Sequence, residues 1–300
     1  MSEPQNLNHK FTTETAICFL IINHIKELPQ VAISSALRAT SSDIYVGYLD
    51  PDTLSDICKN PRIRFIQLES INPHNPAESK RYQDFGTVAF YELVQLKWAL
   101  FRKISDLGYK QIIYSDIDVV WLGDAALALE KTFELFDRAH ILVQSFTRSP
   151  QDSLLCMGIF AFRNSEVSRK FIEICESEHK EALFEKKNIG DDEIVTSVHR
   201  KLGFPEYVRE LPQSTFAVGN FLDLYSTKSH FPGVHKPIPL IFHCNYVVGL
   251  RNKRLMLRLL LNSQQRKELQ IRFGFGFYSL LILKRIRAKK IVNSVLRQFT

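Results

Sequence analysis

GYKQIIYSDIDVVWL, residues 108–122, is the stretch of the sequence that decides the fold. Its largely apolar segment, residues 111–115, predicts a buried strand, and Gly108 before it marks the expected end of a helix. Two carboxylates, Asp116 and Asp118, follow this strand directly. Ligands of open α/β sheets bind beyond the carboxyl ends of the strands, so the pair is the first candidate for a functional site.

The rest of the chain alternates strand-like and helix-like segments around this stretch. Expected strands cover residues 16–22, 43–49, 63–68, 111–115, 140–145, 156–163 and 239–244. Expected helices cover residues 31–40, 51–60, 87–107, 165–184 and 191–202, with a basic helix from about Leu250. This alternation predicts an α/β fold with a Rossmann-like, mostly parallel sheet and helices on both faces. We expect one domain over residues 1–260 and a basic, aromatic segment over 261–300.

Two carboxylates at a strand end repel each other unless a cation lies between them. Mg²⁺ and Mn²⁺ take oxygen ligands, and they commonly bind through one or two carboxylates together with substrate phosphates. A solvated acidic turn is the other reading of Asp116 and Asp118, and an Asp-x-Asp pair alone does not separate the two.

The blocks around this pair occur in a recognisable order. Lys97 precedes the 108–122 block, and MGIFAFR (157–163), GDDE (190–193) and HCNYVVGLRNK (243–253) follow it. In this order and spacing the sequence resembles the nucleotide-diphospho-sugar transferase family, glycosyltransferases of the GT-A fold. The resemblance implies metal-dependent transfer from a nucleotide-diphosphate sugar, a UDP-sugar in our expectation, to a glycan or lipid-linked acceptor, with retention of configuration.

The resemblance also assigns roles to residues outside the 108–122 block. It makes His243 the third ligand of a Mn²⁺ or Mg²⁺ ion held by Asp116 and Asp118, although a lone His is often only a hydrogen-bonded structural residue. It places Lys97 and Lys253, with Asp116, near the donor. A snorkelling Lys97 and a Lys253 that is simply part of a basic helix are the alternatives.

Three acids at the start of the 191–202 helix are the candidate catalytic groups. The family usually carries Asp-Gln here, whereas this chain has Asp191, Asp192 and Glu193, so the equivalent of the Gln is open. The alternative is that these acids only complement the helix dipole. By fold analogy, Asn23 and the adjacent His24 would touch the nucleotide, and Gly158 would let substrate approach the backbone.

Charge is distributed unevenly along the chain. Residues 251–300 contain thirteen Lys or Arg and one acid, whereas residues 1–250 carry a net charge of −5. An apolar, aromatic run at 273–283 is followed by a cationic cluster at 284–290. This pairing predicts binding to an anionic membrane surface rather than to nucleic acid, with a packed terminal helix as the alternative. The run is too short to span a bilayer.

Five cysteines without paired spacing and a polar N-terminus without a secretory signal lead us to expect a cytoplasmic protein, peripheral at the inner face of a membrane. Two other functions remain open. One is a haloacid-dehalogenase-type phosphatase using Asp116 and Asp118, although the Asp-x-Asp of that family lies on its first strand. The other is a non-enzymatic, basic membrane-binding module, which leaves the Asp-x-Asp pair without a role.

Overall fold

A computed structural model of the chain describes residues 13–22, 27–69, 87–145, 154–201, 206–218 and 239–245, and single helical positions between 250 and 261. The strands are β1 (Thr15–Ile21), β2 (Asp43–Tyr48), β3 (Ile63–Gln67), β4 (Gln111–Ser115), β5 (Val119–Trp121), β6 (Ile141–Ser145), β7 (Leu155–Arg163), β8 (Val208–Glu210), β9 (Phe216–Val218) and β10 (Ile241–His243). The helices are α1 (Glu27–Ala39), α3 (Val88–Val94), α4 (Leu96–Ser105), α5 (Ala125–Leu135), α6 (Glu166–Phe184) and α7 (Asp191–Lys201), with a short 3₁₀ helix, η1 (Pro51–Leu54).

Seven strands form the main sheet in the order β3-β2-β1-β4-β7-β6-β8. Only β7 runs antiparallel to its neighbours, β4 and β6; the other pairs are parallel. The predicted mostly parallel α/β sheet is therefore confirmed. From β1, the strands β2 and β3 follow on one side of the sheet, whereas β4 lies on the other side. The loop after β4 therefore lies at a topological switch point, where such sheets bind ligands.

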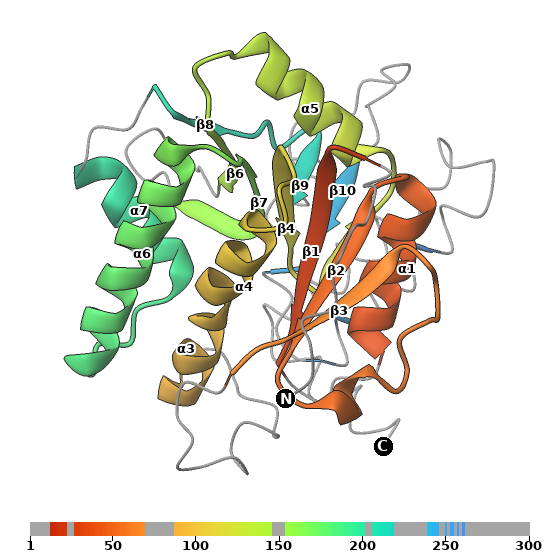
Figure 1. The fold of residues 1–300 in the computed structure, drawn as a ribbon, viewed down its shortest axis with the longest axis horizontal. Helices are drawn as coiled ribbons and strands as arrows, with labels where there is room; N and C mark the ends of the chain where they lie inside the picture. The colour runs from red at the N-terminus through yellow and green to blue at the C-terminus, as the bar shows by residue number, and fades with distance from the viewer. Residues whose placement is uncertain are drawn as a thin grey trace, which may run out of the picture.

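Helices cover both faces of this sheet (Figure 1). Alternate residues of β1 point to opposite sides. Cys18 packs in the cluster that contains residues of α4, α6 and α7, whereas Phe19 packs in the cluster that contains residues of α1 and α5. Both side chains are fully buried, which explains why the strand sequence is continuously apolar rather than alternating.

A second, three-stranded sheet with the order β5-β10-β9 stands beside the first. β5 begins right after Asp118, and it pairs antiparallel with β10 so that His243 lies opposite Val119. This pairing brings residues more than a hundred positions apart in the chain to the end of β4.

The structure corrects two of the expected helices. The segment 51–60 forms only the 3₁₀ helix η1, because its backbone bonds, Thr53 N to Asp50 O and Ile57 N to Leu54 O, span three residues and not the four of an α-helix. The expected helix 87–107 is interrupted at Gln95, where Trp98 N donates to Gln95 O, three residues back. Such a bond tightens the helix locally, which separates α3 from α4.

Gly108 ends this helical region as expected. Its backbone has a φ of 89°, a left-handed conformation that favours glycine. Among the residues described, none of the helices combines the length and apolar character that a bilayer crossing requires.

Candidate active site

Asp116 and Asp118 lie in the turn between β4 and β5, at the carboxyl end of the central strand. The turn is held by Asp116 N, which donates to Gly158 O of β7 at 2.9 Å, and by Val119 N, which donates to Asp116 O at 3.2 Å. The Asp118 side chain is buried and that of Asp116 is 28% exposed. A buried, hydrogen-bonded turn of this kind differs from the solvated acidic turn that was the other reading.

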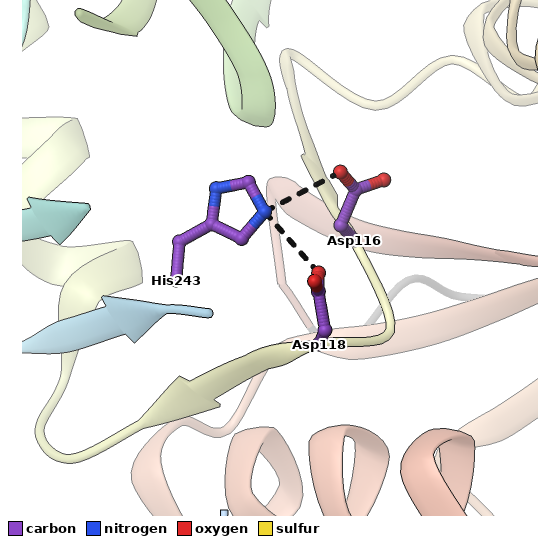
Figure 2. A group of neighbouring side chains, drawn as sticks. All are labelled: Asp116, Asp118 and His243. Atoms are coloured by element: carbon purple, nitrogen blue, oxygen red, sulfur yellow. Dashed lines mark ion pairs between the residues drawn. The ribbon is translucent and has the colours of Figure 1, made fainter. Parts of the chain in front are cut away.

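The imidazole of His243 faces both carboxylates, as Figure 2 shows. Its Nε2 lies 3.2 Å from Asp118 Oδ1 and 3.7 Å from Asp116 Oδ2. The pairing of β10 with β5 fixes this position, and Cys244 N also donates to Asp118 O at 3.0 Å. The ring rests directly on Gly158, where a Cβ would lie 2.0 Å from His243 Cε1, so only glycine leaves room for it.

These three side chains fit a divalent cation. One ligand atom from each of Asp116, Asp118 and His243 lies within 4.8 Å of the others, and two of the three residues are buried. Two carboxylates with one imidazole are a donor set suited to Mn²⁺ or Mg²⁺, since oxygen ligands dominate and no thiolate is among them.

Lys97 of α4 is buried and reaches into the same cluster. Its Nζ lies 2.6 Å from Asp191 Oδ2, 3.0 Å from Asp116 Oδ1 and 4.7 Å from the centre of the Tyr114 ring. Burial alone would lower the pKa of Lys97, but the charges of Asp116 and Asp191 outweigh it and hold this pKa well above its ordinary value. The amine is therefore a fixed positive charge in the site, and the snorkelling alternative is wrong.

Lys253 pairs with the other carboxylate. Its Nζ contacts Asp118 Oδ2. Burial acts to raise the pKa of Asp118, but the charge of Lys253 and the contact with His243 prevail and hold it well below the usual range. Each carboxylate of the Asp-x-Asp pair thus has its own lysine.

The three acids that begin α7 have three different environments. Asp191 is buried against Lys97, and Asp192 accepts a hydrogen bond from Met157 N at 2.6 Å. Burial and the charge of Asp191 raise the pKa of Asp192 well above its usual range. Glu193 is exposed, and its carboxylate accepts from Gly190 N at 2.8 Å, the arrangement of a helix cap. Asp191 and Asp192 therefore lie among the residues of the site. Glu193 has the role of an acid that caps the N-terminus of a helix, which was the alternative interpretation.

Two contacts of the site were not predicted from the sequence. Tyr114 Oη donates to Asp116 Oδ1 at 2.6 Å, and Cys156 Sγ lies 3.4 Å from His243 Nδ1. The two-residue spacing of Tyr114 and Asp116 was a usable signal, since alternate residues of a strand share a face. Nothing in the sequence links Cys156 to His243, which is 87 positions away. Asn23 and His24 lie outside the described residues, as do residues 262–300.

The sequence of the chain matches a known protein family. The sequence profile of the nucleotide-diphospho-sugar transferase family matches residues 42–257, which is more than two thirds of the chain. The chain belongs to this family. Its members are glycosyltransferases that use nucleotide sugars, so the chain is a glycosyltransferase of the nucleotide-sugar type. A comparison with curated protein sequences gave no match.

Solved structures of glycosyltransferases are similar to this chain, and one of them superposes well enough to show a shared fold. The galactosyltransferase LgtC, in complex with donor and acceptor sugar analogues, superposes with a TM-score of 0.54 at 14% identity, covering 81% of this chain and 95% of that one. Mouse xyloside xylosyltransferase 1 gives a TM-score of 0.45 at 13% identity, covering 78% and 97%. The glycosyltransferase GlyE of Streptococcus pneumoniae TIGR4 gives 0.46 at 21% identity, covering 86% and 64%. The predicted GT-A architecture is confirmed.

Membership of this transferase family removes the phosphatase and the non-enzymatic module from consideration. The topology agrees, because the Asp-x-Asp pair follows β4, the fourth of the described strands, rather than the first. The second acidic pair, Asp191 and Asp192, opens a helix instead of ending a strand.

Proposed function

We propose that this transferase is metal-dependent, and that Asp116, Asp118 and His243 hold a Mn²⁺ or Mg²⁺ ion against the diphosphate of a UDP-sugar. The observation that carries the proposal is the convergence of these three side chains at the carboxyl end of β4 (Figure 2). When bound, the ion would offset the charge that develops on the leaving diphosphate.

The charges around the three ligands support this role. Lys97 and Lys253 bring two positive charges against the three carboxylates of Asp116, Asp118 and Asp191. A diphosphate adds further negative charge, so the cluster needs another cation to accept it. We propose that Lys253, which contacts Asp118, also contacts the diphosphate, since an ammonium group pairs well with phosphate oxygens.

For the acceptor side we propose Asp191 and Asp192. Lys97 links Asp191 to Asp116, and so it ties the start of α7 to the metal-binding turn. The hydrogen bond from Met157 N holds Asp192 beside Gly158, next to the His243 ring. Transfer with retention of configuration to a glycan or lipid-linked acceptor completes the proposal, as does a cytoplasmic location at the inner face of a membrane.

The test is release of free nucleotide from a panel of nucleotide sugars, with Mn²⁺ and with excess chelator. We expect release from a UDP-sugar with Mn²⁺, and its loss on chelation with recovery when Mn²⁺ is restored. Full activity in excess chelator would refute the metal dependence. Release from a donor with another base, with none from UDP-sugars, would refute the UDP assignment alone. The anomeric configuration of the product, read by NMR, tests retention.

A further inference from the structure

A row of buried polar side chains lies behind His243, on the side away from the carboxylates. Gln144 of β6 is fully buried and Cys156 of β7 is 1% exposed. Both are surrounded by strands, and burying polar groups costs free energy unless they are hydrogen-bonded. A chain of hydrogen bonds runs from β9 through Gln144 and Cys156 to the imidazole of His243. The chemistry of each group decides which one donates and which one accepts.

Two backbone carbonyls fix the orientation of the Gln144 amide. Gln144 Nε2 lies 3.2 Å from Phe216 O and 3.4 Å from Ala217 O, both on β9. A carbonyl oxygen only accepts hydrogen bonds, so the NH₂ end of the Gln144 amide must face these groups. The amide oxygen, Oε1, then faces Cys156.

The orientation of the Gln144 amide in turn fixes the orientation of the Cys156 thiol. Cys156 Sγ lies 3.9 Å from Gln144 Oε1 and 3.4 Å from His243 Nδ1. The thiol donates to Gln144 Oε1, which can only accept, and this leaves the sulfur lone pairs facing Nδ1. Gly158 N donates to the same sulfur at 3.5 Å, which agrees with the sulfur acting as an acceptor on this side. In this arrangement Nδ1 of His243 is the donor to the sulfur and carries the ring hydrogen.

We propose that Gln144 and Cys156 are positioning residues that keep the ring hydrogen of His243 on Nδ1, so that the lone pair of Nε2 is available to the cation at Asp116 and Asp118. This inference rests on the metal role proposed above. A metal-binding His is commonly oriented by a partner for its other ring nitrogen, and loss of such a partner costs about 10–100-fold in metal affinity or activity. Here the partner is a thiol, itself oriented by an amide that touches neither the ring nor the carboxylates.

The first test is calorimetric titration of the metal-free protein with Mn²⁺ alone. Cys156→Ala should weaken binding by about 10–100-fold, whereas Cys156→Ser, whose hydroxyl both donates and accepts, should recover most of the affinity. Gln144→Leu should also weaken binding, because the thiol hydrogen is then free to turn toward Nδ1. Cys175→Ala is the matched control: Cys175 is equally buried on α6, and this variant should keep the wild-type Kd.

The second test reads the hydrogen itself. In metal-free protein labelled with ¹⁵N-histidine, at a pH where His243 is neutral, long-range ¹H–¹⁵N spectra should show His243 protonated on Nδ1. Protonation on Nε2, or equal Mn²⁺ affinities for Cys156→Ser and Cys156→Ala, would overturn the positioning role. So would a wild-type Kd in Gln144→Leu. If wild-type protein binds no Mn²⁺ at all, the proposed metal site is refuted, and the positioning role is refuted with it. If wild-type protein binds Mn²⁺ but the variants bind it equally well, only the positioning role is refuted.

Discussion

Replacing Gly158 with alanine should remove His243 from the metal site without touching any ligand. The added Cβ would lie 2.0 Å from His243 Cε1 and 2.1 Å from Nδ1, whereas real Cβ contacts essentially never fall below 3.0 Å. The ring must therefore retreat by about 1 Å, roughly five times the 0.2 Å within which metal–ligand distances in proteins stay.

Neither backbone can easily move instead. Gly158 lies within β7, and its O accepts the hydrogen bond from Asp116 N that holds the metal-binding turn, while His243 is paired with Val119 in the second sheet. We expect the Mn²⁺ affinity of Gly158→Ala to fall by at least about 10–100-fold. That is the loss typical when a residue that orients a metal-binding side chain is replaced. Overpacking should also lower the free energy of unfolding by about 1–3 kcal/mol.

The assay pairs Mn²⁺ calorimetry with thermal unfolding, and Gly47→Ala is the control. A Cβ at Gly47 would lie 2.9 Å from Leu100 Cδ1, so this variant also overpacks the core, but it leaves the site alone. We expect Gly47→Ala to lose stability and keep its Kd. A wild-type Kd in Gly158→Ala would show that His243 does not bind the ion from this position, and the proposed ligand set would be wrong.

Asp116→Asn and Asp118→Asn should each abolish nucleotide release with Mn²⁺ while circular dichroism stays unchanged, because each removes one carboxylate from the ion; a variant with near wild-type kcat would remove that residue from the site. Lys97→Met should lower the free energy of unfolding in urea by about 3–5 kcal/mol, because it leaves two carboxylates, Asp116 and Asp191, without their buried partner; an unchanged denaturation midpoint would mean that water or ions already compensate them. Deletion of residues 273–300 should abolish sedimentation with anionic vesicles at low salt but preserve activity on a soluble acceptor mimic; continued sedimentation of the truncated protein would exclude the segment as an anchor.

The central strand and its acids could be predicted from local sequence. Residues 111–115 read as a strand because Ile112, Ile113 and Tyr114 form an apolar centre shortly after Gly108, and the strand has those bounds. The apolar residue types of the strand and the acids that follow it are set by order along the chain, so the position of Asp116 at a strand end could be predicted directly. The expected helix 87–107 is divided at Gln95 and ends two residues earlier, at Ser105; one 3₁₀-type hydrogen bond leaves no mark on the apolar periodicity, so the division could not be predicted.

The complete site could not be predicted in this way, because its members meet only through the sheets. Periodicity could not separate a structural His243 from a ligand, and it was the pairing of β10 with β5 that brought the ring to Asp118. Lys97 likewise had two readings until the packing of α4 placed its amine between Asp116 and Asp191.

The sequence by itself thus determined the strand, the two acids and the family, since each depends on residue type and order along the chain. Only the tertiary structure decided which imidazole and lysines contact those acids and which thiol contacts the imidazole. The physical reason is that a hydrogen bond or an ion pair needs its two groups within a few ångströms. Cys156 and His243 reach that separation across 87 positions only because two sheets close on each other at the end of β4.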